Sequence, residues 1–135
     1  MNIINEQDCI FCKIVNEEIP SIKIYETENI YGFMDIFPLN DGHCLFIPKQ
    51  HSVTMDETSD VALSEILIAI KKVAKKLNIK NYNILQNNGS IAHQQVMHTH
   101  FHLIPKDDTH GLQIVWDPKP SVNQEEIAKL INSKD

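Results

Sequence analysis

A row of histidines at every second position is the feature of this sequence that most restricts its fold. His98, His100 and His102 are each separated by one residue, and Pro105 follows shortly after them. In an extended strand, residues two apart point to the same face, whereas a helix would spread them around its circumference. The spacing therefore predicts a strand over residues 98–104 that ends near the proline, with three imidazoles in a row on one face.

Three interpretations of this row are open. It could be a chance cluster on an exposed strand, a three-histidine metal site, or a catalytic site, since imidazole serves both as a zinc ligand and as a catalytic base. In a regular strand the Cα atoms of His98 and His102 lie about 13 Å apart, so all three rings ligate one metal only if the strand bends. A more natural division gives an end histidine to a metal and the middle one to chemistry.

Length and charge indicate one domain without a nucleic-acid or membrane partner. The 135 residues contain no Gly/Ser linker or internal repeat, so residues 1–135 are expected to form a single domain. The net charge of −6 argues against binding a nucleic-acid polymer, because phosphate backbones need a basic surface. The longest apolar run, 66–70, is far too short to cross a bilayer. Three cysteines fit a reducing compartment, and we expect a cytoplasmic protein.

The apolar pattern predicts a chain of mixed strands and helices. In chain order these are helix 9–16, strands 23–26, 30–36 and 43–48, helix 59–77, strands 82–87 and 98–104, and helix 123–131. Ser59 is the expected N-cap of the long helix, and Asn123 and Glu126 stand at capping-box spacing in the last one. The order indicates an α+β fold, a five-stranded antiparallel sheet with the long helix packed on it. Residues 1–8 are expected to form a loose arm and 121–135 a C-terminal helix and tail.

Cys9 and Cys12 form a Cys-x-x-Cys motif whose role the spacing alone does not decide. A redox dithiol is one interpretation, but such motifs normally follow a strand in a βαβ unit that is absent here. Half of a structural zinc site is the other, and it needs two more ligands to complete a closed tetrahedron. Cys44 is expected to be a buried apolar residue.

The histidine row resembles the signature of the histidine triad family of nucleotide hydrolases and transferases. Further blocks match that family in the same order, namely residues 9–14, 33–38, 47–51 and 87–94. The branch that these blocks resemble is that of the adenosine 5'-phosphoramidases, often called Hint-type proteins. The resemblance implies the same α+β fold, usually assembled as a homodimer.

The resemblance implies that His100 is a covalent nucleophile. A neutral imidazole nitrogen can attack an α-phosphorus and hold the nucleotide as a phosphoramidate, which water then hydrolyses. One ring nitrogen must be free for this, and the other must donate to an acceptor, which the resemblance identifies as the backbone carbonyl of His98. His102 is implied to contact the phosphate or the leaving group.

The segment before the row carries polar residues that the resemblance places at the phosphate. Asn87 and Gln94 offer amide donors, and the backbone N–H groups of Gln94 to Val96 offer more, although ordinary loop residues would look the same. Gln95 stands where relatives of this branch commonly carry serine, and His93 where they often carry glycine. A longer amide at Gln95 changes the contact expected with the leaving group.

Asp35 and a set of apolar residues are expected to hold the nucleoside. A carboxylate among apolar neighbours is costly without partners, and the two hydroxyls of a ribose would supply two donors, as they do for the matching family aspartate. The base would lie among residues for which plain core packing is the competing interpretation: Ile10, Phe11, Phe33, Ile36 and Leu45. Such a pocket implies a purine nucleotide such as AMP with little base discrimination.

In zinc-containing relatives, two histidines complete the cysteine pair, and the matching residues are His51 and His98. The resemblance thus implies a structural zinc held by Cys9, Cys12, His51 and His98. Some Hint-type proteins lack both cysteines, so no metal is required for the chemistry.

The expected function is hydrolysis of the P–N bond of nucleoside 5'-phosphoramidates through a nucleotidyl-histidine. Three alternatives stand beside it. They are a family member that splits dinucleoside polyphosphates, a non-catalytic nucleotide-binding or scaffold protein, and a hydrolase that uses zinc on the histidine row.

Overall fold

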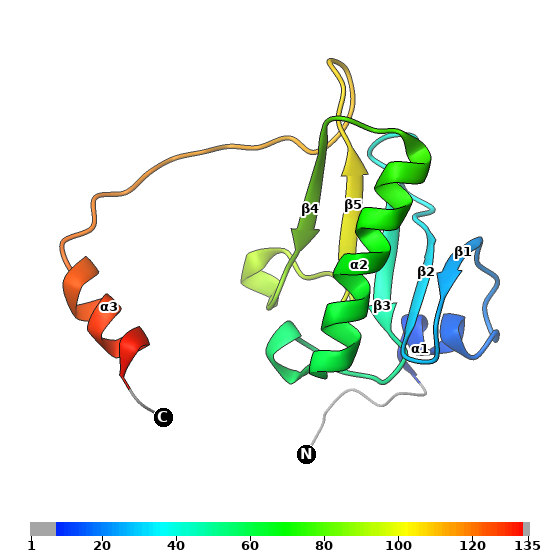
Figure 1. Ribbon diagram of the computed structural model, residues 1–135, viewed down its shortest axis with the longest axis horizontal. Coiled ribbons are helices and arrows are strands. Elements are labelled where there is room, and N and C mark those ends of the chain that lie inside the picture. Colours follow the sequence, from blue (N-terminus) through cyan, green and yellow to red (C-terminus); the bar gives the residue numbers. More distant parts are fainter. Residues whose placement is uncertain (1–7, 134–135) are drawn as a thin grey trace.

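The chain folds into a five-stranded sheet with helices on both sides (Figure 1). The computed structural model describes residues 8–133, so the predicted arm lies outside this part apart from its last residue. The elements, in order, are α1 (Ile10–Val15), β1 (Lys23–Glu26), β2 (Ile30–Met34), β3 (Cys44–Pro48), the short helix η2 (Met55–Glu57), α2 (Asp60–Leu77), β4 (Tyr82–Gln86), the short helix η3 (Ser90–Ala92), β5 (Phe101–Pro105) and α3 (Gln124–Asn132).

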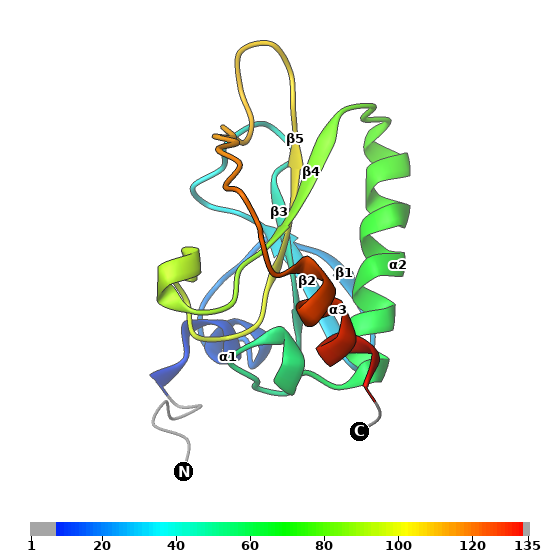
Figure 2. The same cartoon turned by 90° about the vertical axis from the view of Figure 1, so that its left-hand side faces the viewer.

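The sheet has the strand order β1-β2-β3-β5-β4, and every neighbouring pair is antiparallel. Figure 2 shows the sheet nearly edge-on, with α2 along one side and α1 and η3 on the other. The predicted α+β fold, with one long helix packed on a five-stranded antiparallel sheet, is confirmed. Within residues 8–133, no helix combines the length and the apolar character that crossing a membrane requires.

The long helix α2 is held to the sheet by its apolar stripe. Ile66 and Ile70 are fully buried on it and pack with Phe46 of β3 and Leu103 of β5 in one core cluster. Each such side chain contributes about 1.5–3 kcal/mol by leaving water. The hydroxyl of Ser59 accepts the N–H of Ala62, so the predicted N-cap is confirmed.

The other face of β2 and β3 carries a second cluster, which forms the floor of the functional site. Tyr31 pairs with Ile47 and Phe33 with Leu45 across the two strands, and Phe11 of α1 packs over them. Successive residues of a strand point to opposite faces, so the same strands serve both clusters.

The histidine segment differs from the predicted strand. β5 begins at Phe101, and the last residue pair joining it to β3 is Phe46 with Phe101. The N–H of Thr99 donates instead to the carbonyl of Ser52, in the turn after β3. His98 and His100 therefore lie before the strand, outside the ladder, with a bend at His98, and only His102 lies on the strand.

The C-terminal helix also departs from expectation. Asn123 makes no side-chain cap at α3, although its spacing to Glu126 fits a capping box. The apolar face formed by Ile127, Leu130 and Ile131 is exposed, and Figure 1 shows the helix set apart from the sheet at the end of an extended segment. Nothing within this chain covers that face among the described residues.

Candidate active site and metal centre

A pocket of about 550 Å³ opens on the side of the sheet opposite α2. Most of the predicted nucleotide residues line it, together with two of the three histidines of the row: Ile10, Phe11, Phe33, Asp35, Ile36, Leu45, Asn87, Gln95, Val96, His100 and His102. Residues far apart in the sequence thus meet at one site. Of the other predicted residues, Gln94 and His98 are buried beside the pocket.

His100 has one ring nitrogen committed and the other free. Its Nδ1 lies 2.7 Å from the carbonyl oxygen of His98, which can only accept, so Nδ1 carries the hydrogen. Burial lowers the pKa of His100, and the ring is therefore neutral at pH 7. The edge-to-face contact with the Phe11 ring, with centroids 5.2 Å apart, helps to fix its orientation. The result is a neutral imidazole whose Nε2 retains its lone pair.

His102 is oriented by His43, a residue for which the sequence analysis predicts no role. The backbone N–H of Leu39 donates to His43 Nδ1 at 3.0 Å, so the hydrogen of His43 is on Nε2. That Nε2 lies 2.9 Å from His102 Nδ1, which must accept, and His102 therefore carries its own hydrogen on Nε2. Burial lowers the pKa of His102 to about 4 and also lowers the pKa of His43. His102 thus offers a neutral N–H donor beside His100.

Asp35 lies just past the end of β2, not within the strand as expected. Its Oδ1 accepts the N–H of Phe37 at 2.8 Å, and its Oδ2 lies 3.3 Å from His43 Nε2. A carboxylate has about four acceptor positions, so lone pairs remain for hydroxyl donors. Because Asp35 and His43 are opposite each other where the β2–β3 hairpin opens, strand pairing is the sequence signal that could have found His43.

The side chain of Gln94 ties the loop between β4 and β5 to the turn after β3. Its Nε2 donates to the carbonyls of Val53 and Val96, and its Oε1 accepts the N–H of Gly89. Both amide hydrogens are therefore used, and the side chain shapes the loop between β4 and β5. Its predicted contact with a phosphate stays a prediction, and Asn87, which lines the pocket, keeps one amide hydrogen beyond its bond to His93.

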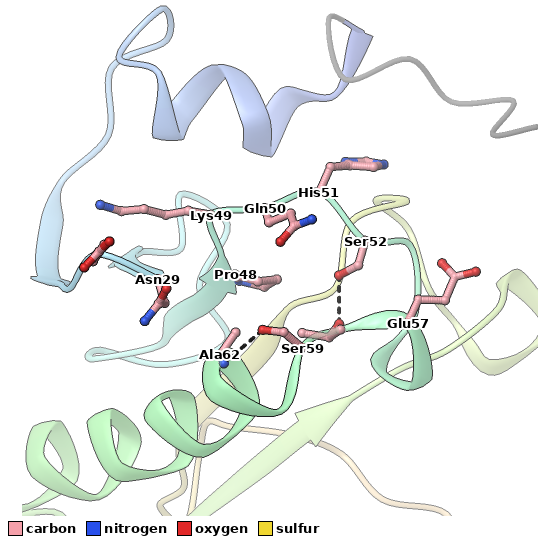
Figure 3. A pocket seen from close by; sticks show the side chains of 11 residues that line it. Asn29, Pro48, Lys49, Gln50, His51, Ser52, Glu57, Ser59 and Ala62 are labelled. Atoms are coloured by element: carbon pink, nitrogen blue, oxygen red, sulfur yellow. Dashed lines mark hydrogen bonds between the residues drawn. The ribbon is translucent and has the colours of Figure 1, made fainter.

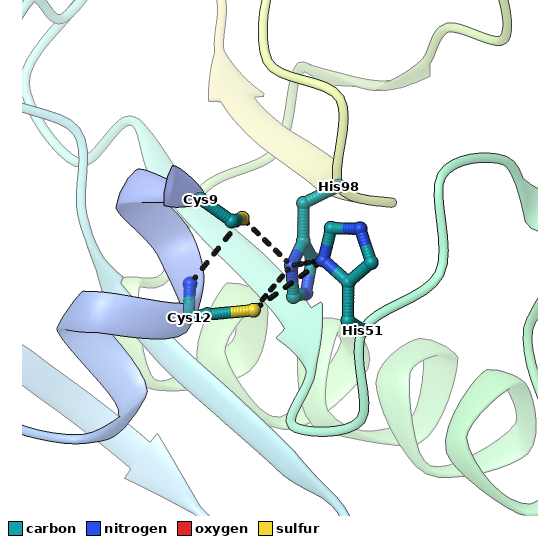
Figure 4. A group of neighbouring side chains, drawn as sticks. All are labelled: Cys9, Cys12, His51 and His98. Atoms are coloured by element: carbon teal, nitrogen blue, oxygen red, sulfur yellow. Dashed lines mark hydrogen bonds between the residues drawn. The ribbon is translucent and has the colours of Figure 1, made fainter. Parts of the chain in front are cut away.

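The predicted metal ligands meet beside this site (Figure 4). Cys9 Sγ lies 3.3 Å from His98 Nδ1, Cys12 Sγ 3.3 Å from His51 Nδ1, and the two Nδ1 atoms 3.2 Å from each other. All four ligand atoms lie within 4.8 Å of one another. A tetrahedral zinc ion separates sulfur and nitrogen ligands by roughly 3.3–3.8 Å, so the set fits that ion.

The surroundings of the four residues also suit a metal. His98 Nε2 donates to the carbonyl of Pro48 at 2.8 Å, which leaves Nδ1 free to ligate, and burial lowers the pKa of His98 to about 4. His51 Nε2 is buried without a hydrogen-bond partner among the described residues. This is expected where the other ring nitrogen, Nδ1, binds a metal and thereby holds the ring in place. His98 lies in this cluster, apart from His100 and His102, so the described residues do not form a three-histidine metal site.

A smaller polar cavity of about 230 Å³ lies between the turn after β3 and the start of α2 (Figure 3). The hydroxyls of Ser52 and Thr58 in its wall bond to each other and to that of the buried Thr99, and Lys49 is paired with Glu26. These bonds anchor the histidine segment to the turn that carries His51. These hydroxyls and the Lys49–Glu26 ion pair therefore stabilise the fold, and we assign them no ligand.

Comparison with known proteins adds independent information. The HIT domain model matches residues 16–109. The adenosine 5'-monophosphoramidase hnt1 of Schizosaccharomyces pombe is 50% identical over 123 residues, which are 90% of this chain and 92% of that protein. The histidine triad nucleotide-binding protein of Candida albicans has a crystal structure with a TM-score of 0.81 and 44% identity, covering 91% of this chain and 92% of the other. The crystal structure of a zinc-bound histidine triad family protein from Mycobacterium smegmatis matches with a TM-score of 0.72 and 34% identity. The match covers 85% of this chain and 86% of the other.

The lowered pKa of His102 predicts a pH-dependent stability. An imidazole in the unfolded chain takes up a proton near pH 6.5, whereas the folded protein keeps His102 neutral down to about pH 4. The unfolded state then binds more protons, so the free energy of unfolding is expected to fall as the pH is lowered from about 6.5 to about 4. Urea denaturation over this range measures the slope.

A His102→Gln variant should show a shallower slope. His110→Gln is the matched control, because His110 is exposed on a turn outside the pocket, and it should keep the wild-type slope. Equal slopes in all three proteins would contradict a neutral His102.

Proposed function

This chain belongs to the HIT domain family, and from this premise we propose that it hydrolyses nucleoside 5'-phosphoramidates through a nucleotidyl intermediate on His100. It is an enzyme of the adenosine 5'-monophosphoramidase type. The observation that carries the mechanism is the hydrogen bond from His100 Nδ1 to the His98 carbonyl, which leaves a neutral Nε2 facing the pocket.

The first step transfers the nucleotide to the protein. The lone pair of His100 Nε2 attacks the α-phosphorus, the P–N bond breaks, and the amine leaves with that electron pair and takes up a proton from solvent. The attacking ring becomes positively charged, and the His98 carbonyl on its Nδ1–H stabilises that charge. His102 Nε2–H donates to a phosphate oxygen as charge develops there. Water then attacks phosphorus, and the bond from phosphorus to His100 Nε2 breaks with its electron pair returning to the ring. The attacking water gives up a proton to solvent, and the nucleoside monophosphate is released.

Binding of the nucleoside follows from the remaining walls. The free lone pairs of Asp35 suit the two ribose hydroxyls, and the apolar side chains of Ile10, Phe33 and Leu45 suit a flat base. Such walls bind by apolar contact, without a donor and acceptor pattern that separates one purine from the other.

The mechanism predicts that His100→Ala loses activity by several orders of magnitude, because the covalent route is then closed. Phosphorus NMR of adenosine 5'-phosphoramidate follows the release of AMP by the wild type and the variant. His110→Ala should retain full activity. A wild type that binds AMP but releases none from the substrate would favour a nucleotide-binding protein instead, and turnover of a dinucleoside polyphosphate alone would favour that class of hydrolase.

We also propose that Cys9, Cys12, His51 and His98 bind one structural zinc ion. The ion would supply a cross-link and no step of the reaction. It would fasten α1, which carries Phe11, to the segment that presents His100. The fit of the four ligand atoms and the zinc-bound relative support this assignment.

The zinc proposal predicts close to one equivalent of metal per chain in protein purified without added zinc. A Cys9→Ser, Cys12→Ser variant should lack the metal and melt at a lower temperature, because bound metal contributes folding free energy. Cys44→Ser is the control for loss of a thiol outside the site and should retain the metal. Freshly purified wild type without metal would refute the assignment.

We propose a homodimer on the evidence of exposed apolar surface. Tyr82 and Ile84 on the edge strand β4 are 42% and 47% exposed, and Trp116 and the apolar face of α3 are exposed on the C-terminal segment. An edge strand with apolar neighbours is a template for pairing with a second copy.

The dimer proposal predicts a particle of twice the 15.5 kDa chain mass in sedimentation equilibrium. Ile84→Glu should shift the mass toward the monomer, because it places a charge on the edge strand. Ile22→Glu changes an exposed isoleucine before β1, at the other end of the sheet, and should leave the mass unchanged. A monomeric wild type at micromolar concentration would disprove the proposal.

Location and other partners remain proposals drawn from composition. Three cysteines support a reducing, cytoplasmic location, and the net charge of −6 supports a protein that does not bind nucleic-acid polymers.

A further inference from the structure

His93 lines the pocket directly after the short helix η3. It is the residue that ends η3, and its backbone has φ +72° and ψ +24°, in the left-handed region. Its N–H donates to the carbonyl of Ser90, and its own carbonyl accepts from Asn87 Nδ2 at 3.3 Å. The backbone is thus held on both sides, while the imidazole lines the pocket.

The conformation of His93 is one that glycine adopts without a steric cost. A residue with a Cβ is uncommon there, and a strained backbone that persists is found more often at functional sites. The imidazole makes no hydrogen bond with any residue of the described part of the chain, so no internal hydrogen bond accounts for the side chain.

The charges around the pocket give this imidazole a distinct role. No lysine or arginine lines the cavity. Three of its four histidines are committed, since His43 and His102 bond to each other, His100 bonds to the His98 carbonyl, and burial lowers the pKa of all three. His93 alone among them is exposed and has both ring nitrogens available to a substrate.

The position of His93 assigns it to one part of the substrate. His93 lines the same pocket as His100 and His102. Its carbonyl accepts from Asn87, the residue that follows β4, and in β4 Leu85 lies opposite His102, so His93 lies near the phosphate end. The nucleoside end is formed by α1 and by the loop that begins at Asp35. Beyond the phosphate, opposite the nucleoside, lies the group that departs.

We infer that His93 binds the leaving group and selects amines that carry a carboxylate or another acceptor near the P–N bond. An imidazole donates one hydrogen when neutral and two when protonated, and it pairs best with an anionic acceptor. Phosphoramidates of amino acids are then better substrates than those of matched neutral amines. The inference rests on the proposed function and names the substrate class of that site.

Two conjugates that differ in one group test the inference. AMP joined through nitrogen to glycine carries a carboxylate, and AMP joined to glycinamide carries a neutral amide in its place. The wild type is expected to give the higher kcat/KM with the glycine conjugate. His93→Gly should lower that preference by roughly tenfold, the size of one hydrogen bond to a charged group, and leave glycinamide turnover nearly unchanged.

The variants separate binding from folding. His93→Gly relieves the left-handed backbone and should melt no lower than wild type, while His93→Gln retains a donor and should restore part of the preference. His110→Gln, outside the pocket, should keep the wild-type ratio. An unchanged ratio in His93→Gly, or an equal loss on both conjugates, would overturn the inference.

Binding of the two conjugates to the His100→Ala variant, with and without His93→Gly, tests the inference separately from the proposed function. This variant lacks the nucleophile, so calorimetry measures the dissociation constants of both intact conjugates. Tighter binding of the glycine conjugate that disappears with His93→Gly supports the contact even if the wild type releases no AMP. Equal affinities of the glycine and glycinamide conjugates, both in His100→Ala and in the His100→Ala, His93→Gly double variant, would exclude the contact.

Discussion

His98 connects the Cys9, Cys12 and His51 cluster to His100: its side chain lies in that cluster and its backbone carbonyl bonds to the His100 ring. The His98 ring lies between the two cysteines of α1 and His51, and its Nε2 donates to the carbonyl of Pro48 at the end of β3. The carbonyl of the same residue accepts Nδ1–H of His100. Any change that moves this one peptide group alters the acceptor that keeps the lone pair on His100 Nε2. In the proposed mechanism, the cysteine pair thus supports catalysis without touching the substrate.

A second chain of hydrogen bonds determines which nitrogen of the His102 ring carries the hydrogen. It runs from the N–H of Leu39 through His43 to His102, and Asp35 lies at its side. Each donor determines which nitrogen of the next ring must accept, so one backbone amide fixes two imidazoles. Burial keeps both rings neutral, which suits a site where the nucleophile needs a lone pair and its neighbour needs a hydrogen.

One face of the sheet packs against α2 to form the main core, and the opposite face carries the pocket. Ile66 and Ile70 of α2 close one face against Phe46, and no pocket-lining residue belongs to that helix. On the opposite face Phe11 of α1 packs over β2 and β3, and the pocket lies beside it. Exposed groups such as His93 lie on the loop between β4 and β5, where a change of side chain alters the substrate contact without disturbing the core.

The sequence alone determined the α+β fold, the Ser59 cap and the long helix, because these depend on periodicity and spacing. The set of residues expected at the site came from the resemblance of the sequence blocks to a known family, and most of that set lines one pocket. The sequence misplaced the start of β5 and the position of Asp35, because strand ends depend on where the neighbouring strand stops. It gave no role to His43, and it could not show that the amide of Gln94 bonds to the carbonyls of Val53 and Val96. Only the tertiary structure decided which nitrogens of His98 and His102 carry the hydrogen. The partners that decide it, Pro48 for His98 and His43 for His102, are brought to these rings by folding from 50 and 59 residues away.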